Sequence, residues 1–300
     1  MALRHEESAG SVRGQGATGW RRRIVSAALA IGVALLSPVV QADRAFATRY
    51  QIAAANGDIV GIGNINLHCG NNPALCSQAQ NSTGSIVNQD PAIAMIHVDI
   101  DGDPATFNSS SASLSLPSGA TVLFAGLYWS GISVSAARNT VRVRPPGAGA
   151  YSILTADELL DNNAGAFGAA AYQGFENVTA MVQAAGNGVY TIANVQTTQR
   201  AVGSAGSTWG GWALIVAYRD PAQSLSRNLS IFDGLVSASD AAFPVDIPFS
   251  GFVTPAVGAA NATIGLVGWD GDDTPDGSAG LQYGPTAGSL NSVFNAVNPV

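Results

Sequence analysis

The sequence predicts an all-β protein, an antiparallel β-sandwich or jelly roll with one short helix. Short runs rich in Val, Ile, Thr, Tyr and Trp alternate with clusters of Gly, Asn, Pro and Ser, a pattern typical of strands joined by turns. Amphipathic helical segments between these runs are almost absent, which argues against a parallel α/β fold. No period of 20–50 residues repeats, so solenoids and propellers are excluded. The predicted strands span residues 58–67, 93–99, 112–116, 121–129, 140–144, 189–197, 212–219, 228–232 and 263–269.

Two stretches, residues 122–129 and 212–218, are continuously apolar and are predicted to be central strands of the core. One helix is predicted over residues 175–185, where apolar residues recur at three- and four-residue spacing. Asn177 can cap its start and Gly186 can end it. Residues 161–171, rich in Gly, Ala and Asn, are predicted to form a surface loop.

The N-terminal segment has the three parts of a secretory signal peptide in the correct order. Basic residues culminating in Arg21-Arg22-Arg23 precede an apolar run over 24–36, and small-residue cleavage sites end at Ala42 and Ala47. The apolar run is too short to span a bilayer, which takes about 20 residues. We therefore predict a signal peptide over residues 1–42, cleaved after Ala42 or Ala47 and exported by either the general or the twin-arginine route. Residues 48–300 are predicted to form a single domain.

The composition excludes several classes of function. All 13 basic residues are arginine, so lysine Schiff bases and Walker-type phosphate sites are absent from the sequence. Charged residues make up 11% of the chain, against about 25% in a typical soluble protein. Cleavage after Ala42 removes five arginines and two glutamates, which leaves eight basic and 18 acidic residues and a net charge of −10. This acidity argues against nucleic acid as a partner, and no membrane span is predicted after cleavage.

The two cysteines, Cys69 and Cys76, lie in the exported part, with six turn-rich residues between them. In an oxidising compartment this spacing predicts a local disulfide. Such a short loop stabilises the fold by about 2–3 kcal/mol. A zinc site is disfavoured because His68 and His97 add too few ligands.

Two aspartate-rich stretches are candidate calcium sites, since carboxylate oxygens are preferred ligands of this cation. Asp99, Asp101 and Asp103 stand at alternate positions after a predicted strand, although the pattern lacks the closing glutamate of an EF-hand. The alternative for both stretches is a plain solvated turn. The second and weaker stretch contains Asp270, Asp272, Asp273 and Asp276.

Catalytic motifs are scarce, and we predict that the protein is not an enzyme. No G-x-S-x-G nucleophile elbow occurs. After residue 42 the only glutamates are Glu158 and Glu176, and nothing in the sequence selects a carboxylate pair for glycoside hydrolysis. Among the aromatic residues, Trp209 is flanked by Gly and Ser and is the predicted loop-borne contact for a ligand.

Several motifs form a series along most of the exported chain. They include Gly57-Asp58-Ile59-Val60 before the cysteine pair, Val98-Asp99-Ile100-Asp101-Gly102-Asp103-Pro104, Ala125-Gly126-Leu127-Tyr128-Trp129, Gly211-Trp212-Ala213-Leu214-Ile215-Val216-Ala217-Tyr218 and Arg227-Asn228-Leu229-x-Ile231-Phe232-Asp233-Gly234. This series resembles the N-terminal region of large bacterial cell-surface proteins of the adhesin type, which continue into tandem immunoglobulin-like repeats. The resemblance implies surface display without catalysis, and a domain that is truncated at its C-terminus.

Two functional hypotheses follow. The first is an exported, non-catalytic cell-surface or secreted module with an adhesion or structural role, whose partner is a surface ligand, either protein or glycan. The alternative is a secreted carbohydrate-binding or carbohydrate-active domain, which the sandwich pattern, the acidic residues and the loop aromatics favour.

Overall fold

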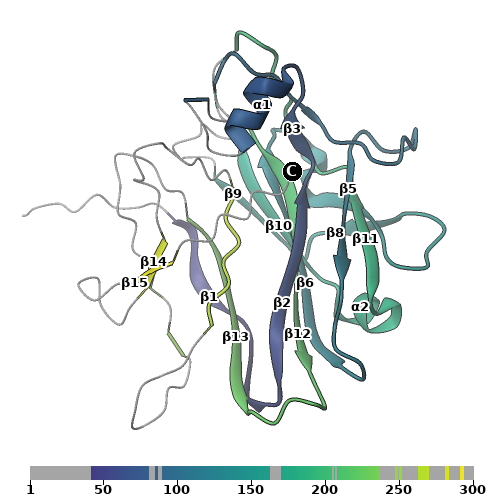
Figure 1. The fold of residues 1–300 in the computed structure, drawn as a ribbon, viewed down its shortest axis with the longest axis vertical. Coiled ribbons are helices and arrows are strands. Elements are labelled where there is room, and N and C mark those ends of the chain that lie inside the picture. The colour runs from purple at the N-terminus through teal and green to yellow at the C-terminus, as the bar shows by residue number, and fades with distance from the viewer. Residues whose placement is uncertain are drawn as a thin grey trace, which may run out of the picture. The chain divides into compact units, whose positions relative to one another are not determined.

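The computed structural model describes residues 42–80, 85–86, 90–162, 170–204, 206, 208–236, 247–248, 250–251, 263–269, 281–283 and 291–293. The chain divides into two compact units, Met1–Ser37 and Pro38–Val300, and all described residues belong to the second. This unit is built mainly of antiparallel sheets packed together in a sandwich-like arrangement, which confirms the predicted fold class (Figure 1). In the described part of the chain, no helix has the length and apolar character needed to cross a membrane.

Two sheets form the sandwich. The central sheet has the order β2-β12-β6-β10-β9, and the outer sheet has the order β5-β11-β7-β8. The central strands are β2 (Gly57–Ile65), β6 (Thr121–Ile132), β9 (Glu158–Asn162), β10 (Ala171–Asn177) and β12 (Gly210–Arg219). The outer strands are β5 (Ser109–Leu114), β7 (Thr140–Arg144), β8 (Ser152–Thr155) and β11 (Gly188–Ala193).

The remaining strands pair in twos. A long ribbon joins β1 (Ala42–Ala55) to β13 (Arg227–Val236). Shorter pairs join β3 (Leu67–Cys69) to β4 (Met95–His97) and β14 (Leu281–Tyr283) to β15 (Asn291–Val293). The described residues also form a 3₁₀ turn at Ala136–Asn139 and two short α-helices, α1 (Pro73–Gln80) and α2 (Thr179–Ala185). The sequence predicted one helix.

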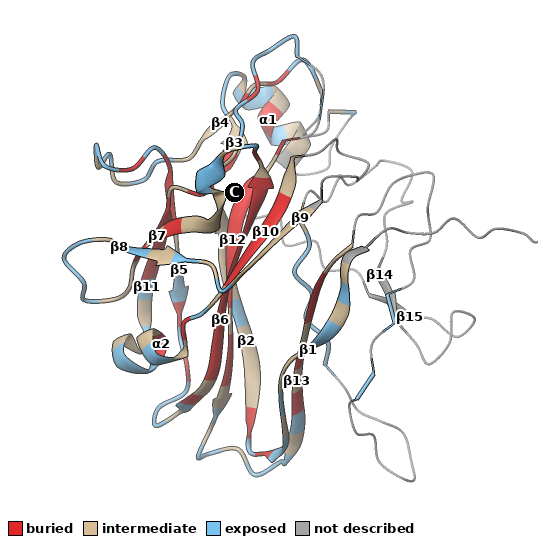
Figure 2. Ribbon diagram, turned by 180° about the vertical axis from the view of Figure 1, so that it is seen from behind, coloured by how far each residue is buried: buried red, intermediate tan, exposed pale blue. Residues whose placement is uncertain are grey.

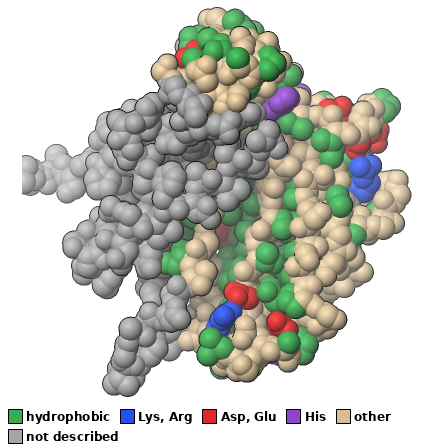
Figure 3. All heavy atoms as spheres, in the orientation of Figure 1, with side chains coloured by type: hydrophobic (Ala, Val, Ile, Leu, Met, Phe, Trp, Pro, Cys, Tyr) green, Lys and Arg blue, Asp and Glu red, His purple; other side chains and the backbone are tan. Residues whose placement is uncertain are grey.

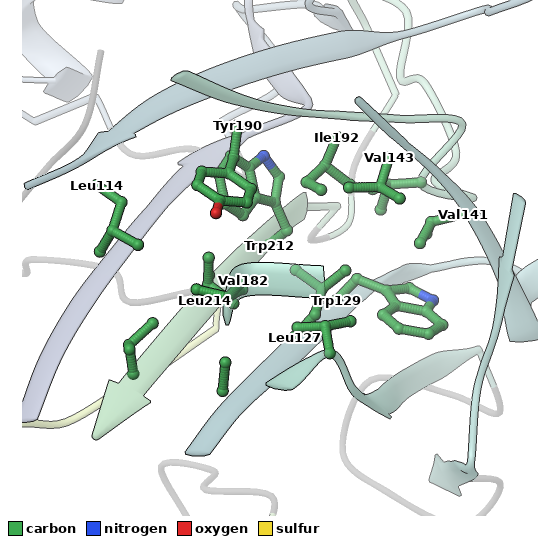
Figure 4. Close-up of a cluster of buried hydrophobic side chains, with 14 of the residues drawn as sticks. Leu114, Leu127, Trp129, Val141, Val143, Val182, Tyr190, Ile192, Trp212 and Leu214 are labelled. Carbon is green, nitrogen blue, oxygen red and sulfur yellow. The ribbon is translucent and has the colours of Figure 1, made fainter. Parts of the chain in front are cut away.

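The main core lies between the central and outer sheets. Strands β6 and β12 pair with Trp129 opposite Trp212 and Leu127 opposite Leu214, and these four side chains are almost fully buried. Figure 4 shows them packed with side chains from the outer sheet, among them Tyr190. Burial raises the pKa of Tyr190 to about 12.

The opposite face of the central sheet is also apolar. Alternate residues of β6, Phe124 and Tyr128, belong to a second buried cluster with Phe175 of β10 and Ile231 of β13. Tyr50 of β1 stacks on Phe124 with ring centroids 5.0 Å apart. Because side chains alternate between the faces of a strand, β6 and β12 supply apolar residues to both sides. The β1–β13 ribbon therefore acts as a third layer over the central sheet.

Buried amides join the strands at one end of the sandwich. Asn66 and Asn108 have no exposed surface, and the Asn66 side-chain amide donates to Asn108 Oδ1 at 3.2 Å. The Ser110 hydroxyl donates to Asn66 Oδ1 and accepts from the Trp212 indole N–H. Buried polar groups of this kind are tolerated because each has a partner, and here they connect the β2–β3 junction to β5 and β12.

Eight of the nine predicted strands overlap observed strands, and the last predicted strand along the chain is wrong. Residues 263–269 form no strand. Their exposed apolar side chains include Leu266, while Trp269 packs partly against the second cluster. The predicted ranges do not include strands β1, β8, β9, β10, β14 and β15. Of the predicted loop 161–171, Asp161 belongs to β9 and Ala171 to β10, and residues 163–169 lie outside the described residues.

The helix predicted over 175–185 is wrong in its first half. Phe175 lies in β10, where it pairs with Tyr128 of β6 and Glu158 of β9. The helix begins at Thr179, whose N–H donates to Asn177 Oδ1, and it ends before Gly186 as predicted. The apolar spacing of residues 175–185 fits a helix that starts one turn earlier, and it also fits a strand that ends before a shorter helix. Pairing of Phe175 with its neighbours in the sheet selects the strand.

The surface is poor in charge. On the face that Figure 3 presents, charged side chains occur in small groups among hydrophobic and other side chains. This agrees with the low charged fraction of 11%.

Gly174 of β10 is required by the packing of a tryptophan. It lies opposite Trp129 of β6, and a Cβ at this position would lie 2.3 Å from the ring atom Cε2. The ring has no exposed surface, and its N–H donates to the carbonyl oxygen of Arg138 at 3.0 Å. It therefore has no room to move aside.

We expect Gly174→Ala to lower the free energy of unfolding by about 2 kcal/mol, because overpacking a rigid core forces strain. Gly149→Ala is the matched control, since a Cβ there meets nothing within 4 Å, and it should change stability by less than about 0.5 kcal/mol. Urea denaturation measures both. Equal stabilities for the two variants would contradict the packing described for Trp129.

Candidate functional site

The densest group of charged side chains lies between the β1–β13 ribbon and the central sheet. It contains Arg44 and Arg49 of β1, Glu158 of β9, Asp233 of β13 and Tyr128 of β6, and we call it the arginine–carboxylate cluster. The Asp233 side chain is 7% exposed, whereas the arginines and Glu158 keep 21–29% exposure. Asp233 is therefore the buried centre of the cluster.

Hydrogen bonds and ion pairs cross-link the cluster. Arg44 Nη2 donates to Asp233 Oδ1 at 2.5 Å, and Arg49 Nε donates to Asp233 Oδ2 at 2.6 Å. The Tyr128 hydroxyl donates to Asp233 Oδ2 at 3.0 Å. Glu158 Oε2 accepts a hydrogen bond from Arg49 Nη2, and Glu158 Oε1 lies 3.1 Å from Arg44 Nε. Each arginine thus bridges the same two carboxylates.

The electrostatics of the cluster favour a structural clamp. Burial alone would lower the pKa of Arg49, but hydrogen bonds and charge from Asp233 and Glu158 raise it above its ordinary value. Burial and the Asp233 carboxylate hold the pKa of Tyr128 well above its ordinary range. The Arg49 guanidinium also lies 4.1 Å from the centroid of the Phe175 ring. With both carboxylates neutralised and the phenol kept protonated, these groups are poorly suited to acid–base catalysis.

Sequence reasoning missed this cluster. Arg44 lies between the two predicted cleavage sites and outside the predicted domain of residues 48–300. The available signal was Asp233, a charged residue inside the apolar run from Ile231 to Leu235. A charge in a buried strand requires a partner, but the sequence does not identify that partner.

The aspartates of the first predicted calcium site form a tight turn. Asp99 Oδ1 and Asp101 Oδ1 both accept from the Ser109 hydroxyl, at 2.9 and 3.0 Å. Asp103 Oδ1 accepts from the backbone N–H of Ala105 at 2.9 Å. Arg144 Nη2 of β7 lies 3.1 Å from Asp101 Oδ2, and the Tyr151 hydroxyl donates to this same oxygen.

Asp101 is held in its charged form by these partners. Burial would raise its pKa, but the hydrogen bonds from Tyr151 and Ser109 and the charge of Arg144 lower it below its ordinary value. Within the described residues, no three His, Cys, Asp or Glu side chains are arranged to hold a metal ion. Calcium binding by this turn stays a prediction, and Asp270, Asp272, Asp273 and Asp276 lie outside the described residues.

The other predicted site residues are placed as follows. Trp209 is half-buried, and its indole N–H donates to the Ser130 hydroxyl at 3.2 Å. Ligand contact by this ring stays a prediction. Cys69 and Cys76 form the predicted disulfide, with Cα atoms 5.4 Å apart, which confirms the pairing. It links β3 to α1.

Glu158 and Glu176 do not face a common site. Glu158 pairs across the sheet with Phe175, the residue before Glu176, so the two carboxylates project from opposite faces. Two carboxylates that flank one glycosidic bond must share a face. This geometry removes the glutamate pair as a hydrolytic site.

Comparisons of the chain with protein-family models, curated proteins and solved structures find no match. The site geometry is therefore interpreted from its own chemistry.

We expect Asp233→Asn to lower the free energy of unfolding by about 3 kcal/mol, because it removes the more deeply buried of the two carboxylates that Arg44 and Arg49 share. Asp58→Asn is the control, because Asp58 pairs with Arg227 where both side chains are over a third exposed. That change should cost less than about 1 kcal/mol. Chemical denaturation of both variants makes the comparison, and a milder effect at Asp233 than at Asp58 would show that the cluster does not hold β1.

Glu176 gives a pH-dependent prediction. Burial and the adjacent Asp157 carboxylate raise its pKa, so the folded state binds a proton more tightly than the unfolded state. Its contribution to stability is therefore present at low pH and is lost as the pH rises through the folded pKa. We expect Glu176→Gln to be more stable than the wild type at pH 7, by about 0.2–1 kcal/mol, and equally stable near pH 3.5. Thermal unfolding at the two pH values tests this, and a destabilised variant at pH 7 would refute it.

Proposed function

We propose that the protein is an exported, non-catalytic β-sandwich module of the bacterial cell surface or extracellular medium, with an adhesion or structural role. The observation that carries the proposal is the signal-like segment over residues 1–42, which leads directly into a layer of the fold. The Cys69–Cys76 disulfide supports an oxidising location. The resemblance of the motif series to adhesin-type proteins supports surface display.

The chemistry of the described residues supports a role without catalysis. The arginine–carboxylate cluster is neutralised internally, and the two glutamates project from opposite faces. His97 lies in β4, with its ring Nε2 3.3 Å from the carbonyl oxygen of Thr197. Rigid layered sheets with small polar turns suit a module that presents a binding surface.

The contacts of β1 favour one of the two predicted cleavage positions over the other. Cleavage after Ala47 would remove Arg44, which contacts both Asp233 and Glu158. It would also remove the part of β1 that pairs with the end of β13. Cleavage after Ala42 leaves these contacts intact, so we infer that Ala42 is the processing site.

Expression of the full chain in a bacterial host with both export routes tests the proposal. We expect the protein outside the cytoplasm, with Asp43 as its first residue by intact-mass measurement and with no free thiol. Replacing Leu35 and Leu36, in the apolar segment, by arginine should retain the uncleaved chain in the cytoplasm, while Ile153→Ser, on an exposed strand, should leave export unchanged. Accumulation of uncleaved wild-type chain in the cytoplasm would overturn the proposal.

A further inference from the structure

Strands β7 and β8 present a mixed cationic and apolar surface on the outside of the outer sheet. In β7, Val141 and Val143 are buried in the core, so the alternate residues project from the other face. Thr140 pairs with Thr155, and Arg142 pairs with Ile153. We call this the β7–β8 face, and it consists of Thr140, Arg142, Arg144, Tyr151, Ile153 and Thr155. Figure 2 shows β7 and β8 side by side at one side of the sheets.

Arg142 is the unusual residue of this face. After residue 42 the chain has eight arginines, and five of them are ion-paired: Arg44, Arg49, Arg138, Arg144 and Arg227. Within the part of the chain that the structure describes, the side chain of the half-buried Arg142 has neither an ion pair nor a hydrogen bond. In a domain of net charge −10, an uncompensated guanidinium on a paired, interior strand is a position for an external anion.

The side chains around Arg142 indicate which chemical groups such an anion would carry. Ile153 is 64% exposed beside it, and the Tyr151 ring lies 4.6 Å from the guanidinium carbon of Arg144. Asp101 neutralises Arg144, so the net positive charge of the face is at Arg142. The Thr155 side chain is exposed, and the Thr140 hydroxyl donates to the carbonyl oxygen of Ala137 and can still accept. An unpaired guanidinium, an exposed isoleucine side chain and two threonine hydroxyls thus lie along two adjacent strands.

We propose that the β7–β8 face binds an acidic polysaccharide whose sugar units carry carboxylates. A guanidinium pairs with a carboxylate through two parallel hydrogen bonds, the apolar face of a sugar ring packs on Ile153, and threonine hydroxyls bond to sugar hydroxyls. A single uncompensated arginine is too little charge to hold nucleic acid on an acidic domain. This inference rests on the proposed function, because such polymers are met outside the cell.

The test measures binding of the exported chain, residues 43–300, to polygalacturonate by isothermal titration calorimetry. Fully methyl-esterified polygalacturonate is the matched ligand, since it keeps the sugar backbone and lacks the charge. Dextran sulfate tests whether any polyanion is sufficient. We expect binding to polygalacturonate that weakens with added salt, and no binding to the ester.

Arg142→Ala should weaken binding by about tenfold or more, the usual loss for a hydrogen-bonded charge pair. Arg142→Lys should restore it only in part, because an ammonium cannot pair in the bidentate way. The control is Arg219→Ala, which removes the same charge from an exposed arginine at the end of β12, and it should change affinity less than twofold. Thermal midpoints within a few degrees of the wild type would show that the variants are folded.

The inference is overturned by no binding to polygalacturonate, by equal binding to the ester, or by equal losses from Arg142→Ala and Arg219→Ala. Dextran sulfate binding that matches polygalacturonate would also overturn it, because it would show recognition of charge alone. Export is measured independently. An exported protein that fails to bind refutes only this inference, whereas a binding protein retained in the cytoplasm refutes the proposed function.

Discussion

Both faces of the central sheet are apolar, and the rest of the fold follows from the need to bury them. Strands β6 and β12 carry large side chains on each side, with Trp129 and Trp212 facing the outer sheet and Phe124 and Tyr128 facing the β1–β13 ribbon. Burial of apolar surface is the main favourable contribution to folding, at roughly 25 cal/mol per Å². A two-layer sandwich would leave one of these faces in water. A third layer is therefore a physical requirement of the two continuously apolar strands.

The third layer explains why charge is concentrated where it is. The β1–β13 ribbon is a separate two-stranded sheet, and among the described strands no backbone pairing joins it to the central sheet. Arg44 and Arg49 reach from β1 to Glu158 of β9 and to Asp233 of β13, and thereby fasten the ribbon to its neighbours. The same residues follow the signal-like segment directly, so the proposed processing site and the integrity of the fold are coupled. On the outer sheet, by contrast, the Arg142 side chain has no such partner among the described residues, and this difference supports a binding role there.

Local patterns predicted much of the fold because they depend on near neighbours in the chain. Residues 140–144 form β7 with the predicted bounds, the two cysteines pair across a short loop, and Gly186 ends α2 with a positive φ of 67°. Predictions failed where distant segments compete for one stretch of chain. Phe175 could serve a helix or a strand, and its pairing with β6 and β9 selected the strand. The strand-like residues 263–269 found no pairing partner among the described strands.

The sequence by itself determined the all-β class, the apolar central strands, the disulfide and the acidic, lysine-free composition, because each depends on residue type and short spacing. Only the tertiary structure decided which charges meet. It brought Arg44 to Asp233 across 189 positions of the chain, placed Glu158 and Glu176 on opposite faces, and left Arg142 without a counter-ion in the described part of the domain. The physical reason is that charge pairing in this fold is set by strand order and register, and neither is encoded in any local stretch of the chain.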